Sequence, residues 1–222
     1  VFVQFKPAFA FRLLCSLAIL MASHRQSPAA TSATIVEELS RRDASEVIFA
    51  TRGVLEEHWY ANFGYLAPGP DKKLYSEGGR LCRLDLQTGE LTVLFEDTEG
   101  GIRDPQVHYE GQRIVFSYRK GGTPNYLLYE IGIDGTGLRQ LTHGKWDDIE
   151  PCYLPDGDIV FVSSRAMRWV QCWLSPVAVI HRCNADGGDI RALSANVEHD
   201  NTPWVLPDGR LLYTRWEYVD RS

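Results

Sequence analysis

The chain repeats one sequence pattern three times at long intervals. In each copy a proline is followed six residues later by a glycine, and then by a short β-branched or aromatic run that ends near an arginine. The three prolines, Pro105, Pro151 and Pro203, are 46 and 52 residues apart. A period of this length indicates a repeat architecture, in which each copy is one supersecondary unit that packs against its neighbours.

A second marker keeps the same spacing. Gly89, Gly135 and Gly187 each follow a threonine or an aspartate, and they too are 46 and 52 residues apart. Glycine accepts positive φ, so these dipeptides favour tight hairpin turns. Each turn is followed by a segment that we expect to be a short strand, at residues 90–95, 138–142 and 190–194.

The hydrophobic pattern around these markers predicts antiparallel sheets. Apolar runs at Ile114–Phe116 and Ile159–Phe161 are typical of strands buried on both faces, whereas Tyr129, Ile131 and Ile133 alternate as in a half-buried strand. Four short strands within one such repeat form the blade of a β-propeller. We therefore predict an all-β fold, a partial β-propeller of four-stranded antiparallel blades.

The repeat also predicts the blade boundaries. Val47–Arg52 resembles the apolar strand of the later copies, so the first blade begins there. The blades then cover about residues 46–99, 100–147 and 148–199, and an incomplete one lies at 200–222. Complete propellers have about four to eight blades. About three blades and the start of a fourth, in a chain that begins with a valine, indicate a fragment of a longer protein.

The first 30 residues are typical of an export signal. Lys6 and Arg12 precede or border an apolar run at 13–22, which is too short to span a bilayer, and small residues follow it. We expect a signal peptide at 1–30, a linker with a short helix at 31–45, and a periplasmic or secreted protein. The alternative for the first segment is a mistranslated upstream stretch.

Charge excludes two classes of partner. Residues 31–222 contain 20 basic and 29 acidic side chains, which gives a net charge of −9. Such a surface repels phosphate backbones, so we expect no nucleic acid partner. A polybasic membrane patch is absent too, and no integral membrane segment is expected once the signal is removed.

The cysteines permit disulfides, and the sequence lacks the common cofactor and catalytic motifs. Cys82, Cys152, Cys172 and Cys183 permit two disulfides in an exported chain. No C-x-x-C or C-x-x-C-H motif occurs, so we expect no cofactor in this segment, and haem only in other parts of the protein. The G-x-S-x-G and P-loop motifs are absent as well.

Longer strings of the sequence resemble one known family. The repeated sequence pattern, from the proline to the arginine, is similar to the repeat of TolB-type propellers. Arg103–Gly122, Gly135–Thr142 and Glu198–Ser222, the last with His-Asp-Asn-Thr-Pro-Trp, resemble the middle domain of the hydrazine synthase alpha subunit and its relatives. The resemblance covers residues 46–222 and implies an exported propeller domain in a larger protein, often beside c-type haem domains. Its implied partners are other domains of the same protein or a partner subunit.

The same resemblance carries over no catalytic residue. In the synthase proper, haem and a metal-binding cysteine take part in joining two nitrogen species. Relatives carry extra cysteines near Ser163–Trp173, where this chain has Val162 and Ala166 and keeps Cys172. We therefore expect no catalytic or metal-binding residue in this segment.

Acidic residues ahead of each blade are the first candidates for a binding site. Asp104, Asp148, Glu150, Asp200 and Asn201 recur just before the innermost strands, as does Asp147. In a propeller these positions lie round one mouth of the central channel, where a ring of carboxylates can hold a cation such as Ca²⁺. The alternative is that each acid accepts hydrogen bonds from backbone N–H groups at its own turn.

Arginines and histidines give the remaining candidates. Arg119, Arg165 and Arg215 recur at the ends of the second strands, and we expect them to pair with acids on adjacent blades rather than to bind substrate. His199 precedes Asp200, and His58 and Tyr60 lie in an insertion at residues 54–78. Either histidine is a candidate ligand or general base, with a structural role as the alternative.

These observations predict a binding or scaffold module. The chain would serve as an exported propeller domain of a larger, redox-associated protein. One alternative is the propeller part of a haem or metal enzyme related to the hydrazine synthase alpha subunit. Another is the gating propeller of a secreted peptidase, whose hydrolase domain would follow the propeller.

Overall fold

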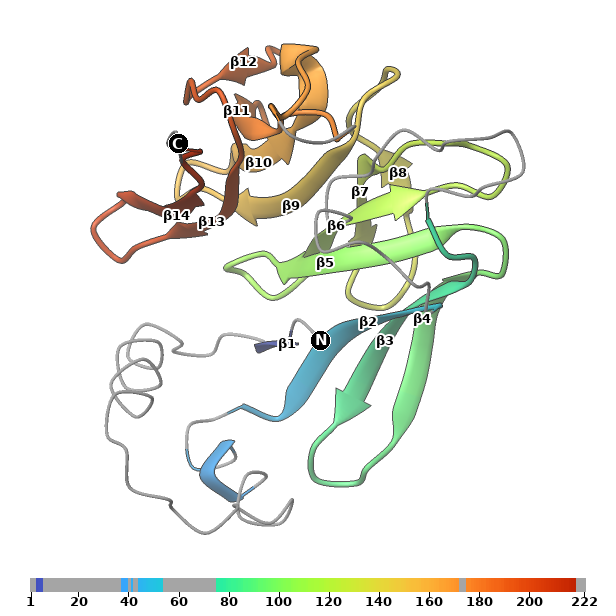
Figure 1. Cartoon of the computed structure of the whole chain (residues 1–222). Coiled ribbons are helices and arrows are strands. Elements are labelled where there is room, and N and C mark those ends of the chain that lie inside the picture. The colour runs from blue at the N-terminus through green and yellow to red at the C-terminus, as the bar shows by residue number, and fades with distance from the viewer. Residues whose placement is uncertain are drawn as a thin grey trace, which may run out of the picture.

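The structure is a computed structural model that describes residues 3–5, 37–39, 41, 44–53, 75–171 and 175–218. Within these residues nearly all regular structure is β, arranged as four antiparallel sheets that follow one another along the chain (Figure 1). The predicted fold class, all-β with propeller-like sheets, is confirmed. In the same residues, the helical structure consists of one turn at 37–39, inside the predicted linker, and a 3-10 turn at Ser164–Ala166.

The first and second sheets each contain four strands. The first sheet has the order β1-β2-β3-β4 and the second β5-β6-β7-β8. Their bounds are β1 (Val3–Phe5), β2 (Glu46–Arg52), β3 (Gly79–Asp85), β4 (Leu91–Asp97), β5 (Gly101–Val107), β6 (Arg113–Arg119), β7 (Leu127–Gly132) and β8 (Arg139–Gln140). The strand β1 lies inside the segment predicted to be a signal peptide and pairs antiparallel with β2.

The third and fourth sheets continue the series. The third has four strands, and two strands of the fourth are described. Their bounds are β9 (Asp148–Tyr153), β10 (Ile159–Ser163), β11 (Val179–Cys183), β12 (Arg191–Ala192), β13 (Asp200–Val205) and β14 (Leu211–Arg215). The strands after the turn glycines were predicted, but β8 and β12 are only two residues long.

Neighbouring sheets bury their faces against each other. Along β6, Ile114 and Phe116 pack toward the first sheet, whereas Val115 packs with residues of the third sheet such as Phe161. Along β10, Val160 packs in a different cluster from Phe161, together with Val205 of the fourth sheet. The two continuous apolar runs are therefore buried on both faces, as their sequence predicted.

The turn glycines have a second role that the sequence did not indicate. A Cβ on Gly135 would lie 2.9 Å from the carbonyl oxygen of Leu94, and one on Gly187 would lie 2.0 Å from that of Leu141. Each of these turns therefore abuts the backbone of the preceding sheet. Gly89 in the first sheet has no neighbour within 4 Å of the same position. Close backbone approach between sheets thus adds to the positive φ that all three share.

The first strands of the second, third and fourth sheets, β5, β9 and β13, each contain a β-bulge at the same place in the repeat. Asp104, Glu150 and Thr202, each directly before a proline, have φ of 54°, 53° and 53°. The register of the strand pairs shifts at these positions. A non-glycine residue before proline rarely adopts this conformation, so the surrounding contacts must hold it. The bulges bring three equivalent side chains to neighbouring inner strands.

One expectation, the disulfides, is wrong, and several others concern residues outside the described part of the chain. Cys82, Cys152 and Cys183 are buried free thiols in separate strands, so the permitted pair of disulfides does not form. Most of the predicted signal peptide, Cys172, and the part of the insertion with His58 and Tyr60 lie outside the described residues. In the described part of the chain, no helix has the length and apolar character needed to cross a membrane.

Candidate functional site

The bulges of neighbouring sheets are joined through acidic side chains. A carboxylate oxygen of Asp104 accepts the backbone N–H of Glu150 at 3.2 Å, and Glu150 in turn accepts the N–H of Thr202 at 2.5 Å. Each acid therefore binds the equivalent bulge in the next sheet. The expected alternative, in which each acid serves its own turn, is wrong for these two residues. The reason is that the bulge aims the side chain along the series of sheets.

A buried arginine lies between these two carboxylates. The guanidinium of Arg103 is 2.6 Å from Asp104 and 3.7 Å from Glu150, and its side chain is 5% exposed. Burial lowers the pKa of Arg103, but the two neighbouring acids outweigh this and raise it overall. Burial and the charge of Asp104 raise the pKa of Glu150 to about 7.

Two of the acids that were predicted to hold a cation, Asp104 and Glu150, therefore already have a positively charged partner in Arg103. Arg103 occupies the position between Asp104 and Glu150 where a bound cation would be expected. Among the residues that the structure describes, no group of three His, Cys, Asp or Glu side chains is arranged to hold a metal ion. The arrangement can hold two sheets together and can take up a proton near neutral pH.

Two further acids form ion pairs within their own sheets. Asp148 is 2.6 Å from Arg165 and also accepts the hydroxyl of Ser163 at 2.6 Å. Asp200 is 2.8 Å from Arg215. The expectation that these arginines pair with adjacent blades is wrong, because the register places each acid near the arginine at the end of the partner strand. Asp148 and Asp200 are fully buried, so both pairs are structural.

The remaining predicted site residues do not converge on these acids. His199 is buried, accepts the backbone N–H of Ala178 at 3.2 Å and packs on Trp216 with ring centroids 5.6 Å apart. Burial lowers its pKa to about 4, so the imidazole is neutral at physiological pH and is poorly suited to proton transfer there. Asn201 is half-buried and pairs with Thr214 in the strand ladder.

The structure adds a cluster that the sequence analysis missed. Tyr75 and Tyr126 are buried and pack edge to face, with ring centroids 4.8 Å apart. Arg119 lies 6.0 Å from the centroid of each ring. Asp147 accepts the N–H of Tyr126 at 2.8 Å, and burial raises its pKa to about 6. The available signal was a break in the repeat: Ile102 stands where Asp148 and Asp200 stand in the later copies.

Known proteins resemble the chain in sequence and in fold. No family model matches the chain. Hydrazine synthase subunit alpha of Kuenenia stuttgartiensis is 34% identical over 102 residues, which cover 45% of this chain and 11% of that protein. The chain therefore spans about a tenth of the curated relative.

Two solved structures have similar folds. The hydrazine synthase structure from Kuenenia stuttgartiensis matches with a TM-score of 0.60 at 22% identity, over 76% of this chain and 27% of that one. TolB from Acinetobacter baumannii matches with a TM-score of 0.53 at 14% identity, over 78% of this chain and 36% of that one. These likenesses confirm the β-propeller fold, which the chain shares with TolB, and together with the sequence match they confirm the predicted resemblance: the chain is similar to part of the hydrazine synthase alpha subunit.

Proposed function

We propose that this chain is an exported propeller module that serves as a scaffold or binding domain in a larger, redox-associated protein. The observation that carries the proposal is the 34% identity, over 102 residues, to hydrazine synthase subunit alpha. Its partners would be other domains of the same protein or a partner subunit. The periplasm or the cell exterior is its proposed location.

The disposition of the polar side chains supports a structural role. Asp104, Glu150 and Arg103 connect the second, third and fourth sheets, and Asp148 and Asp200 are held by arginines of their own strand pairs. These contacts use the carboxylates that the sequence marked as candidate ligands. A module of this kind contributes rigidity and surface rather than a reacting group.

The fourth sheet supplies a surface on which a partner can bind. Its strand β14 pairs only with β13 among the described strands, and Leu212 on β14 is 59% exposed (Figure 1). Tyr213 is also exposed, whereas the equivalent residues of β10 are fully buried by the neighbouring sheet. An apolar strand exposed in this way is stabilised by association with a further strand or domain.

A cross-linking experiment tests the proposal. The full chain is produced in its native host with a photo-cross-linking amino acid at position 212, or at the exposed Leu138 of the second sheet as the control. We expect cross-links from position 212 to another domain or subunit, and recovery from the periplasmic or exterior fraction. Equal cross-linking from both positions, or retention inside the cell, would contradict the proposal.

The same relative favours a second candidate, in which the propeller forms part of a haem or metal enzyme. Its supporting observation is again the identity to hydrazine synthase subunit alpha. Protein purified from the native host would then show visible haem absorption or a stoichiometric metal. A colourless preparation without bound metal would exclude this candidate for the chain and leave the scaffold proposal intact.

A further inference from the structure

The outermost strand of the first sheet is much longer than its equivalents in the later sheets. In the second and third sheets the outer strands β8 and β12 have two residues each, whereas β4 has seven, Leu91–Asp97. Among the described strands β4 pairs only with β3, so it forms one edge of the first sheet (on the right of this sheet in Figure 1). The first sheet therefore has a long edge strand where later copies of the repeat have almost none.

Packing against the second sheet holds β4 in place. Leu94 and Phe95 pack in the core between the first and second sheets, and the ring of Phe95 meets that of Tyr118 edge to face, with centroids 5.0 Å apart. The backbone of Leu94 also abuts the turn at Gly135, and the register with β3 shifts at Leu94. The shift and the turn divide the strand, so the open part of its edge is residues 91–93.

This open part presents backbone groups and apolar side chains together. The N–H of Asp85 donates to the carbonyl of Glu90 at 2.9 Å, so these two residues form a hydrogen-bonded pair of the ladder. Because such pairs alternate along antiparallel strands, the N–H and C=O groups of Leu91 and Val93 point away from β3. The side chains of Leu91 and Val93 are 56% and 44% exposed. An incoming strand would therefore find main-chain partners and apolar contacts at the same place.

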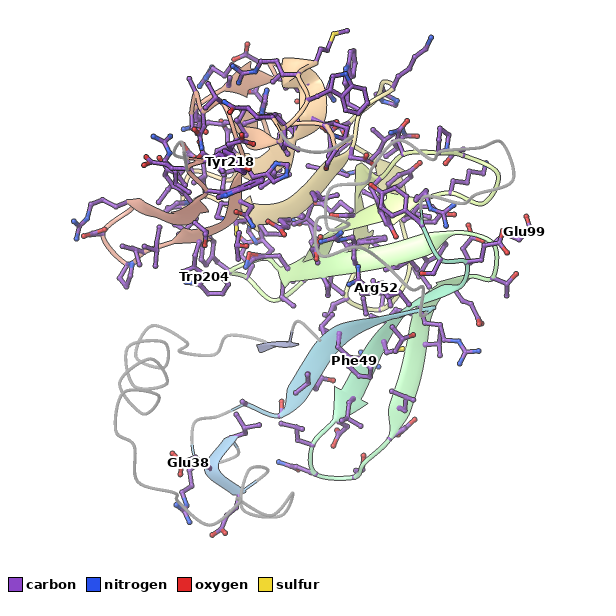
Figure 2. All side chains as sticks on the ribbon, viewed as in Figure 1. Glu38, Phe49, Arg52, Glu99, Trp204 and Tyr218 are labelled. Atoms are coloured by element: carbon purple, nitrogen blue, oxygen red, sulfur yellow. The ribbon has the colours of Figure 1, made fainter. Side chains whose placement is uncertain are left out.

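The charge along this edge is negative throughout. Residues 84–99, which include β4 and the turns on either side of it, contain five acidic side chains and no basic one. Glu90 directly precedes the open part, and Glu99 is exposed in the turn after β4 (Figure 2). Glu96 is paired with Arg80 at 2.6 Å, whereas no basic side chain of the described residues pairs with Glu90 or Glu99. The strand also lacks lysine and proline, which commonly block pairing at an edge.

These charges decide which kind of strand can add to the edge. A second copy of β4 would bring two sets of the same acids together, and like charges across an interface repel each other. A segment with basic residues compensates the acids instead. The alternation of side chains along a strand then sets the pattern, because residues beside Leu91 and Val93 should be apolar and those beside Glu90 and Thr92 basic.

We propose that the edge of β4 at residues 91–93 binds an extended segment of a partner protein in which apolar residues alternate with basic ones. The segment adds to the first sheet as a further strand. Main-chain hydrogen bonds to Leu91 and Val93 supply the affinity, and the charge of Glu90 favours a basic residue beside it. This edge belongs to a different sheet from Leu212, so it adds a second contact surface to the module.

Titration calorimetry on the full chain tests this inference with three short synthetic peptides. One alternates lysine and valine, the second alternates glutamate and valine, and the third is the lysine–valine peptide with N-methylated valines. We expect saturable binding of the first peptide. The other two should bind at least about tenfold more weakly, because the second loses charge complementarity and the third loses main-chain hydrogen bonds.

A matched pair of variants tests the edge from the side of the protein. Val93→Pro removes an N–H that points away from β3, so it should weaken the lysine–valine peptide about tenfold and leave the ladder with β3 intact. Leu138→Pro, at an exposed position of the second sheet, is the control and should leave binding unchanged. Amide hydrogen exchange locates the peptide, because the N–H groups of Leu91 and Val93 should become protected when it is bound.

Three results would overturn the inference: no saturable binding of the lysine–valine peptide, equal affinity for either of the other peptides, or protection that arises away from β4. Dimers of the unaltered chain that Val93→Pro abolishes would identify a second copy as the occupant, and they too would overturn it. Circular dichroism shows whether Val93→Pro is folded, and the N-methylated peptide on the unaltered chain remains decisive if it is not. None of these results bears on cross-linking from position 212.

Discussion

The repeat glycines offer a graded test of how the sheets pack. Alanine at Gly89, Gly135 or Gly187 adds the same methyl group at a positive φ of 74° to 87°. A left-handed conformation costs an alanine about 1–2 kcal/mol relative to glycine. At Gly89 nothing lies within 4 Å of the added Cβ, so this backbone term is the whole expected loss in the free energy of unfolding.

The other two positions add a steric term. The Cβ would lie 2.9 Å from the Leu94 oxygen at Gly135 and 2.0 Å from the Leu141 oxygen at Gly187. At Gly187 the backbone atoms must move apart by more than an ångström to reach ordinary van der Waals contact, whereas a smaller shift is enough at Gly135. Overpacking of this kind costs about 1–3 kcal/mol. We therefore expect a total loss of about 2–5 kcal/mol for Gly187→Ala, a smaller loss for Gly135→Ala and the smallest for Gly89→Ala.

Equilibrium unfolding in urea measures this series directly. The urea midpoint should be highest for Gly89→Ala, lower for Gly135→Ala and lowest for Gly187→Ala. The slope of the unfolding free energy against urea concentration should be the same in all three variants. Equal losses at all three positions would mean that only the turn conformation matters. The claim that each repeat turn abuts the preceding sheet would then be refuted.

The buried charges give three further predictions. Asp148→Ala leaves Arg165 without its carboxylate and should cost about 3–5 kcal/mol in thermal or urea unfolding, whereas Asp208→Ala, in an exposed pair, should leave stability unchanged. Folding raises the pKa of Glu150 to about 7, so the unfolded chain ionises first and the contribution of Glu150 to stability should fall as pH rises from about 4.5 to 7; a stability difference between the unaltered chain and Glu150→Gln that does not change over this range contradicts the assignment. At Asp97, hydrogen bonds outweigh burial and lower the pKa to about 2, so stability should be lost between about pH 3.8 and 2; Asp97→Asn should lack that loss in an acid titration.

The sequence was sufficient to predict the elements that depend on local pattern. Apolar runs such as Ile159–Phe161 indicated strands buried on both faces, and the turn glycines indicated the hairpins. These features depend on residue type and period, which are visible in one chain. The lengths of β8 and β12 were overestimated, because outer strands at the edge of a sheet carry little apolar pattern.

The contacts of the candidate site could be predicted only in part. The acids were marked correctly as a recurring set, but their partners depend on register and on the bulge, which a period alone does not determine. Asp148 therefore binds Arg165 in its own sheet, whereas Asp104 reaches Glu150 in the next one. The Arg119 cluster was missed because its signal is an absence, an isoleucine at position 102 where the repeat has an aspartate.

Amide hydrogen exchange at the bulges tests most directly whether acidic side chains join consecutive sheets. The N–H groups of Glu150 and Thr202 bind carboxylates of the preceding sheet, so both should be protected in the unaltered chain. In Asp104→Ala we predict rapid exchange at Glu150 while Thr202 stays protected. Exchange at Glu150 that is already rapid in the unaltered chain, or that does not respond to Asp104→Ala, would contradict the account.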